Sequence, residues 1–280
     1  MQVVQNRAFD EERAFYGSRD IKIIDCKFDG EADGESAFKE SANISAENCY
    51  FNLRYPFWHD ETIYINNCEM TTLCRAALWY SRNISVENSR LHGIKALREC
   101  ENVSLNNVNV LSTEFGWFSK KIKMTASEAE GEYFMFGARD ILLDGVSFTG
   151  KYSFQYVENA VLENCSLNTK DAFWHAKNVT VRNSVIRGEY LAWYSENLTL
   201  ENCVIYGTQP FCYCNGLKLI NCEMHEADLA FELSDVDATV TTSVISIKNP
   251  KKGRISVLSV GEIINDNDSC ECEIIVAPQS

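Results

Sequence analysis

Apolar and polar residues alternate in short segments that recur with a period of about 19 residues along the chain. In Asn178-Val-Thr-Val-Arg-Asn183 and Asn197-Leu-Thr-Leu-Glu-Asn202, two apolar side chains on alternate positions are enclosed by two asparagines. Alternation with a period of two predicts a strand with one buried face. A Cys or Ser follows each segment, and after it comes a second short apolar alternation, as in Cys203-Val-Ile205. The pattern therefore predicts an all-β chain.

The second asparagine of each segment defines the repeat. Its positions along the chain are Asp25, Asn48, Asn67, Asn88, Asn107, Gly145, Asn164, Asn183, Asn202 and Asn221. The one long interval, between Asn107 and Gly145, holds two periods. A period near 19 is too short for a strand and helix unit of about thirty residues, but it fits one turn of a three-stranded coil. We therefore predict a right-handed parallel β-helix of roughly eleven turns, stacked about 4.8 Å apart.

The repeat also predicts the domain organisation. Because it runs from about residue 14 to about residue 232, residues 1–280 are expected to form a single elongated domain. The pattern fades beyond residue 232. Residues 233–280 are expected to supply further strands and a C-terminal cap.

Composition and charge restrict the partners. The chain has 40 acidic and 26 basic residues and a net charge of −14, which disfavours nucleic acid. No segment is apolar enough for a signal peptide or a membrane span, so we expect a cytoplasmic protein without membrane contact. Six of its twelve cysteines directly follow the repeated asparagine position, which predicts a column of small buried thiols instead of disulfides.

Stacked coils turn each position of the repeat into a column. The asparagines are expected to form an amide ladder and the Cys/Ser positions a buried stack, and both have a structural explanation. The column ten residues after the asparagine is different, because it holds all the tryptophans: Trp58, Trp79, Trp117, Trp174 and Trp193. The same column contains Lys39, Arg98 and Gln155, which need partners when buried. We therefore expect this column to face outwards and the uncharged column before it to face the core.

An outward tryptophan column with polar neighbours predicts carbohydrate binding. The following column adds phenol, imidazole and carboxylate groups, among them His175 and Tyr194. Pyranose rings have apolar faces and polar rims, which such a surface matches. Two alternatives stay open: a wide coil buries the tryptophans as core, or the column packs against a second copy of the chain in a homo-oligomer.

Charged residues at the start of the same strand are the catalytic candidates. Asp171 and Glu189 lie on successive turns, at about the separation of roughly 5 Å that a retaining glycosidase pair requires, and Lys170 and His175 lie nearby. For β-elimination at a uronic acid, the needed cation and base have candidates on the same side of the coil. These candidates are Lys95, Arg98, Lys151 and Lys170. The cysteine spacings do not fit a structural zinc site, and we expect neither a metal nor a cofactor.

Several motifs resemble those of a known family. Thr169-Lys-Asp-Ala-Phe-Trp-His175, Gly188-Glu-Tyr-Leu-Ala-Trp-Tyr194 and Ile94-Lys-Ala-Leu-Arg-Glu-Cys100 are similar to segments of a bacterial family of uncharacterised function with a pectin-lyase-like right-handed β-helix. The resemblance covers about residues 9–264. It implies the fold, and it implies no established activity. The wider superfamily contains pectate lyases and polygalacturonases, but polygalacturonase-type Asn-Thr-Asp and Gly-His-Gly motifs are missing here.

The sequence leaves three functions open. The first is a glycosidase or polysaccharide lyase that acts on an oligosaccharide along the tryptophan column. The second is a carbohydrate-binding protein without catalysis, which needs the aromatic column but no acid and base pair. The third is a structural protein that assembles through the same column.

Overall fold

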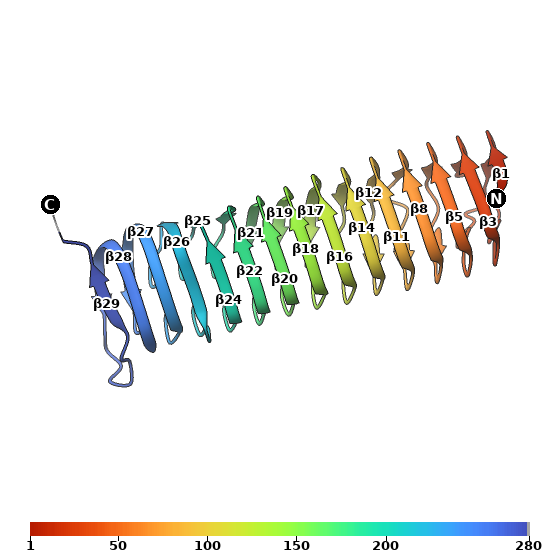
Figure 1. Ribbon diagram of the computed structural model, residues 1–280. Coiled ribbons are helices and arrows are strands. Elements are labelled where there is room, and N and C mark those ends of the chain that lie inside the picture. The colour runs from red at the N-terminus through yellow and green to blue at the C-terminus, as the bar shows by residue number, and fades with distance from the viewer. Residues whose placement is uncertain (279–280) are drawn as a thin grey trace. The chain divides into compact units, whose positions relative to one another are not determined.

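The computed structural model describes residues 1–278, and the regular elements of this part of the chain are all β-strands. Contacts within the chain divide it into two compact units, Met1–Leu142 and a second unit that begins at Leu143. Within each unit the strands of successive coils pair in parallel (Figure 1). The fold is a right-handed parallel β-helix with about 19 residues per turn, as the repeat predicts.

Each coil of the first unit has three sides. The first side consists of β1 (Gln2–Gln5), β3 (Arg19–Ile24), β5 (Ala42–Glu47), β8 (Glu61–Asn66), β11 (Arg82–Glu87), β14 (Glu101–Asn106) and β16 (Lys120–Thr125). The second side consists of β2 (Ala8–Phe9), β4 (Lys27–Phe28), β6 (Tyr50–Phe51), β9 (Glu69–Met70), β12 (Arg90–His92), β15 (Asn109–Leu111) and β17 (Glu128–Glu132). The third side contains only three short strands, β7 (Phe57–Trp58), β10 (Leu78–Trp79) and β13 (Leu97–Arg98).

The second unit repeats the first two sides. Its first side consists of β18 (Arg139–Asp144), which contains the boundary, β20 (Glu158–Glu163), β22 (Lys177–Arg182), β24 (Glu196–Glu201), β26 (Leu217–His225), β27 (Asp235–Lys248), β28 (Lys252–Ile264) and β29 (Glu273–Val276). The second side contains β19 (Ser147–Lys151), β21 (Ser166–Lys170), β23 (Val185–Arg187) and β25 (Val204–Tyr206). In β26, β27 and β28 a single long strand replaces separate ones, and these strands still pair in parallel.

The described residues form about 14 turns, compared with the eleven that the repeated asparagines indicate. One additional turn is N-terminal, where Asn6 lies one period before Asp25 and has the same left-handed backbone, with φ of 54° and 52°. The others contain β27 and β28, whose sequences lack the asparagine at this position. The strands of these turns pair in parallel like the others, but their sequences lack the asparagine by which the other turns were recognised.

The core is a column of stacked aromatic rings. In the first unit, Phe28 and Phe51 lie with their ring centroids 4.8 Å apart, and Phe38 and Phe57 lie 5.0 Å apart. In the second unit, Phe154 and Phe173 are 4.9 Å apart. Because identical positions stack at the coil spacing, the offset parallel arrangement that aromatic pairs favour repeats along each unit.

Two amide ladders follow the coils, one at each end of the first-side strands. At the C-terminal end, Asn67 donates to Asn48 and Asn107 donates to Asn88, each at 2.8 Å. The ladder asparagines have φ near +50°, a conformation that Asn tolerates better than most residues. The predicted ladder is therefore present. A second ladder, which was not predicted, uses the first asparagine of each segment, as where Asn197 donates to Asn178 at 3.1 Å.

The Cys/Ser stack is buried as predicted, and it also has a hydrogen-bonding role. The backbone N–H of Cys165 donates to Ser184 Oγ at 2.9 Å, and Ser184 Oγ donates to the Arg182 carbonyl at 2.6 Å. The N–H of Cys49 likewise lies 3.3 Å from Cys68 Sγ. A small side chain with a lone pair therefore satisfies a backbone N–H of the preceding coil at the turn where the sheet ends. All twelve cysteines are free thiols.

Candidate functional site

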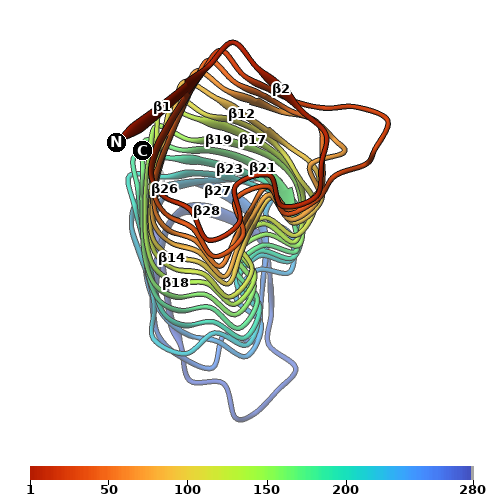
Figure 2. The same cartoon turned by 90° about the vertical axis from the view of Figure 1, so that its right-hand side faces the viewer.

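The third side of the coil, which carries the tryptophans, has an unusual backbone. Figure 2 shows its corrugated path beside the smooth first side. Its first and last residues have positive φ in successive coils, for example Tyr55 with 56° and His59 with 61°. A backbone interrupted by residues with positive φ cannot form a long regular strand, which is why only three short strands are found there in the described residues.

Two kinds of coil differ at the central residue of this side. In what we call forward coils, with third sides at residues 13–17, 36–40, 55–59, 76–80 and 95–99, the central residue is not among those with positive φ. Its N–H donates to the following coil, as from Phe57 to the Ala77 carbonyl at 3.0 Å. In reversed coils, which begin with residues 114–118 and continue to 229–233, the central residue has positive φ. Its N–H then donates to the preceding coil, as from Phe173 to the Ser153 carbonyl at 3.0 Å.

The reversed coils provide an acceptor for each indole. Trp117 Nε1 donates to the Tyr133 carbonyl at 2.8 Å in the first unit. In the second unit, Trp174 Nε1 and Trp193 Nε1 donate to the carbonyls of the third-side residues 16 positions later, at 2.7 and 2.8 Å. Each tryptophan of a reversed coil therefore has a structural role, because it satisfies a carbonyl on the corrugated backbone.

Gln155 occupies the same column and corrects one expectation. We expected it to point outwards because its amide needs a partner, but the residue is buried and Gln155 Nε2 donates to the Asp171 carbonyl at 3.0 Å. Its amide N–H therefore replaces the indole N–H. Cys212 of this column is buried as well, whereas Phe231 stacks on Phe211 in the neighbouring inward column and the partly exposed Glu232 takes its place. In the second unit the column is thus partly core, and its tryptophans reach the surface.

The tryptophans of the forward coils have no such acceptor. Trp58 and Trp79 stack with their ring centroids 5.5 Å apart, and their Nε1 atoms are buried without a hydrogen-bond partner. The ammonium group of Lys39 lies 4.1 Å from the centroid of Trp58. The faces of the Trp58 indole are therefore covered by a cation and by Trp79, so this partly exposed residue does not offer a free face to a sugar ring.

In the second unit the column next to the tryptophans forms a continuous stack at the surface. The rings of Tyr156, His175, Tyr194 and Tyr213 follow one another with centroids 4.9, 5.0 and 4.8 Å apart and nearly parallel planes. Tyr156 is 50% exposed and Tyr194 is 44% exposed, and the other two residues are partly exposed. Tyr213 also packs edge-on against Trp193, at 5.7 Å. We call these four residues the tyrosine–histidine stack.

Three of the predicted catalytic residues lie together in the second unit. Lys170 Nζ is 3.1 Å from Glu189 Oε2, and both side chains are about half exposed. Asp171 is only 6% exposed. Burial raises the pKa of the Asp171 carboxyl, the Lys170 ammonium lowers it, and the Glu189 carboxylate raises it. These three groups therefore influence one another electrostatically.

The other two candidates have different surroundings. His175 belongs to the tyrosine–histidine stack, between Tyr156 and Tyr194. Arg98 belongs to the first unit, where its guanidinium lies 3.1 Å from Glu99 and 3.5 Å from Glu114 and covers the ring of Trp117. Arg98 is thus engaged in ion pairs with both acids.

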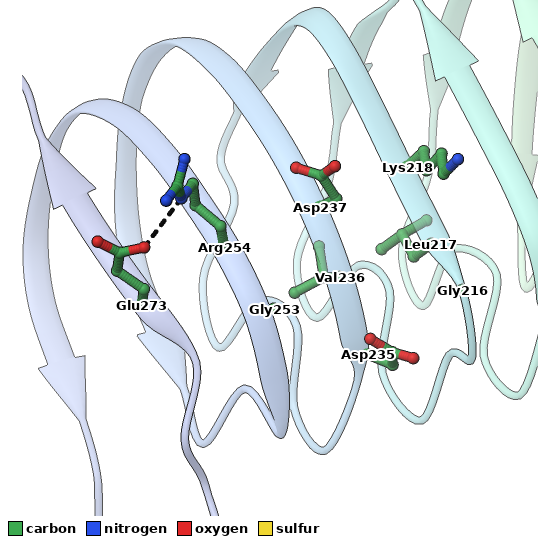
Figure 3. Close-up of a pocket in the computed structure, with 9 residues that line it drawn as sticks. All are labelled: Gly216, Leu217, Lys218, Asp235, Val236, Asp237, Gly253, Arg254 and Glu273. Atoms are coloured by element: carbon green, nitrogen blue, oxygen red, sulfur yellow. Dashed lines mark hydrogen bonds and ion pairs between the residues drawn. The ribbon is translucent and has the colours of Figure 1, made fainter.

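A surface hollow in the second unit was not predicted. It has a volume of about 470 Å³ and is lined by charged residues of β26, β27, β28 and β29, among them Lys218, Asp237 and Arg254 (Figure 3). It lies where the amide ladder of Asn159, Asn178 and Asn197 ends, because Gly216 takes the next position and has no side chain. In the sequence, Gly216 stands one period after Asn197, where the repeat predicts an asparagine. This replacement could have located the hollow.

No group of three or more His, Cys, Asp or Glu side chains in residues 1–278 is arranged to hold a metal ion. The same residues contain no helix with the length and apolar character that a membrane crossing requires.

The parallel coils and the ladders define a right-handed β-helix protein of the pectin-lyase-like class. Within this class, the chain belongs to the family DUF3737, proteins of unknown function, which it matches over residues 2–276. No curated protein matches its sequence.

Solved structures with a similar fold are distant in sequence. A double mutant of the tailspike protein of E. coli bacteriophage HK620, in complex with pentasaccharide, is 8% identical with a TM-score of 0.46, over 90% of this chain and 60% of the tailspike chain. The A-module of the mannuronan C-5 epimerase AlgE4 of Azotobacter vinelandii is 8% identical with a TM-score of 0.36, over 84% and 87% of the two chains. PfbA, a surface adhesin of Streptococcus pneumoniae, is 14% identical with a TM-score of 0.35, over 80% and 71%. This chain thus spans less than two thirds of the tailspike chain that it matches.

Proposed function

We propose that the protein binds an oligosaccharide along the tyrosine–histidine stack of its second unit. The observation that carries the proposal is the presence of four aromatic side chains, Tyr156, His175, Tyr194 and Tyr213, at the surface and at the coil spacing. An extended glycan advances by nearly the same distance with each sugar as the β-helix does with each coil. One ring edge and one polar tip therefore face each sugar.

The stacking determines how such a glycan would be held. Because the rings cover one another's faces, the sugar contacts their edges, which carry partial positive charge and attract hydroxyl oxygens. The phenol and imidazole groups add hydrogen-bond donors and acceptors at the same spacing. The pairing of Trp193 with Tyr213 holds one end of the stack in place. The proposed ligand is therefore a hydroxyl-rich extended chain.

A glycan array followed by calorimetry tests the proposal. Wild-type protein should bind a defined set of glycans, and Tyr194→Ala should reduce the affinity at least tenfold because it interrupts the stack. Tyr206→Ala is the matched control, since Tyr206 stacks on His225 at 4.8 Å on the second side of the coil. Absence of glycan binding by the wild type, or equal binding by Tyr194→Ala, would contradict the proposal. So would a wild-type dimer that Tyr194→Ala dissociates, because the stack would then be an interface between copies.

The second candidate function is hydrolysis of the bound glycan, and the environment of Asp171 favours it. A buried carboxyl with a raised pKa suits a general acid, and the neighbouring Glu189 would act as base or nucleophile with Lys170 beside it. On a glycan that the wild type binds, Asp171→Asn and Glu189→Gln should abolish the release of reducing ends without changing the affinity. Binding without turnover by the wild type would leave the protein a binding module.

A further inference from the structure

The buried polar atoms without a hydrogen-bond partner are concentrated in the forward coils. Among residues 1–278, the side-chain atoms of this kind are Ser36 Oγ, Arg54 Nε, Trp58 Nε1, Asp60 Oδ2 and Trp79 Nε1. All lie between residues 36 and 79. Four of them are donors. Buried donors in native proteins are nearly always paired with protein, water or a ligand, so a cluster of orphans in one place requires an explanation.

The reversed coils show that the orphan indoles are not a general property of the column. Trp117, Trp174 and Trp193 occupy the same column, and each of their Nε1 atoms donates to a backbone carbonyl. Trp58 and Trp79 differ in belonging to forward coils. Neither N–H group donates to a backbone carbonyl, and that of Trp79 lies beside the Tyr80 hydroxyl, so both are open to an acceptor that is not part of the chain.

The charges around these donors favour an anion. Arg54 is held by Asp33 and Glu35, at 2.9 and 3.5 Å, which leaves its Nε unpaired. Arg75, one coil further on, is exposed, and none of the ion pairs in the described part of the chain includes it. Lys39 contributes a third cation, over the face of Trp58.

The nearby acids are engaged elsewhere. Glu40 accepts from the Tyr16 hydroxyl at 2.7 Å, and Glu114 pairs with Lys95 at 3.4 Å and with Arg98. Asp60 Oδ1 accepts from the Ser41 N–H at 2.8 Å. Glu40 keeps its negative charge, because the Tyr16 hydroxyl is neutral, and Arg54 is balanced by Asp33 and Glu35, so Lys39 and Arg75 are the cations of this surface that no acid in the described residues pairs with.

We propose that Arg54, Trp58, Arg75 and Trp79 form a binding site for an oxyanion, such as the carboxylate of an acidic sugar or a phosphate group. The oxygens of the anion accept from Trp58 Nε1, Trp79 Nε1 and Arg54 Nε, and Arg75 supplies charge. The two indole N–H groups belong to successive coils, so each can donate to a different oxygen of the same oxyanion. The site is independent of the tyrosine–histidine stack, which belongs to the second unit.

Tyr55 controls access to this site. Its ring centroid lies 6.0 Å from that of Trp58 and 6.2 Å from that of Trp79, so it packs against both indoles. The next coil has Ala76 at the corresponding position, and its short side chain leaves room for the phenol ring. An anion reaches the buried N–H groups when Tyr55 turns towards solvent.

The five indole N–H signals in a ¹H–¹⁵N correlation spectrum provide a direct test. The protein would be titrated separately with sodium sulfate, inorganic phosphate and glucuronate, and with sodium chloride at matched ionic strength. Oxyanions should move the Trp58 and Trp79 signals downfield and leave those of Trp117, Trp174 and Trp193 unchanged. The relative affinities for phosphate and glucuronate distinguish the two sources of the oxyanion. If no oxyanion shifts the two signals, or if chloride does so equally, the proposal is wrong.

Variants separate a site from general charge attraction. Arg75→Ala should weaken oxyanion binding at least tenfold, whereas Arg90→Ala removes another exposed arginine and should have no effect. Tyr55→Ala should increase the association rate, because it removes the cover. Circular dichroism verifies that each variant is folded. Equal weakening by Arg75→Ala and Arg90→Ala would overturn the proposal, as would unchanged binding by Arg75→Ala.

Discussion

The forward and reversed coils place the same kind of side chain in the same column and give it different roles. In reversed coils the indole N–H of Trp174 satisfies a carbonyl, whereas in forward coils that of Trp58 has no partner. This difference in hydrogen bonding coincides with one difference in the backbone, the sign of φ at the central residue of the third side. A column of identical residues is therefore uniform in position but not in function, and a ligand is best sought where the backbone leaves donors unused.

One forward coil differs from its neighbours in the residue that follows its third side. This residue has the largest expected effect on the free energy of unfolding. Asp60 stands where Ser41 and Ser81 stand in the adjacent forward coils and Ser119 in a reversed coil. It is 1% exposed, and burial raises the pKa of its carboxyl from 3.8 to about 8, with Glu40 adding to the increase. Above pH 4 the unfolded chain releases the proton that the folded protein retains. The free energy of unfolding should therefore fall as the pH rises from about 4 to about 8, by on the order of 5 kcal/mol.

Asp60→Ser restores the serine of the column and should remove this pH dependence. The measurement is urea unfolding of both proteins at intervals from pH 4 to pH 9, with Asp60→Asn as a control that keeps the shape. Parallel curves for wild type and Asp60→Ser would show that Asp60 is ionised in the folded protein.

Gly116 begins the reversed coils and should be the most sensitive central residue. Its φ is +80°, and an added Cβ would lie 2.5 Å from Met135 Sδ. Gly116→Val should lower the free energy of unfolding by about 2 kcal/mol, because a branched side chain is strained at positive φ. Leu97→Val, at the same position of a forward coil, should cost only about 1 kcal/mol through its small cavity. If chemical unfolding shows equal losses of stability for the two variants, the proposed difference in φ between Gly116 and Leu97 is wrong.

Removing the indole N–H distinguishes the two kinds of coil with one substitution. Trp174→Phe leaves the Tyr190 carbonyl without its hydrogen-bond donor. Trp58→Phe loses the same ring area but no hydrogen bond. We therefore expect Trp174→Phe to lower the free energy of unfolding by about 1 kcal/mol more than Trp58→Phe does. Denaturant midpoints of the two variants give this difference. A greater loss for Trp58→Phe would mean that its N–H has an acceptor after all.

The smallest expected effect concerns the ion pair between Lys170 and Glu189. Because both side chains are about half exposed, Glu189→Gln should change the free energy of unfolding by about 0.5 kcal/mol or less. A large loss of glycan turnover in this variant would therefore reflect chemistry and not folding. Thermal unfolding of the variant beside the wild type provides the necessary comparison.

The repeat was sufficient to predict the first and second sides, because a buried face and a ladder require fixed residue types at fixed spacing. The strand Lys177–Arg182 and the Asn67–Asn48 bond are examples. The third side was less predictable, since its backbone depends on the φ of one residue, and Phe57 and Phe173 have the same side chain with opposite outcomes. The burial of Gln155 escaped prediction because its partner is a main-chain carbonyl. Roles of Asp171 and Glu189 depend on a ligand, so they stay predictions, as does the cytoplasmic localisation.

Both amide ladders have a consequence for how the gene can change. In the second unit, successive ladder positions such as Asn164, Asn183 and Asn202 are each one period apart, and each coil presents nearly the same contacts to the coils before and after it. Loss or duplication of one whole period would therefore join surfaces that already match. Proteins with this architecture can vary in length by complete coils, whereas insertions of any other size are confined to the corners between strands.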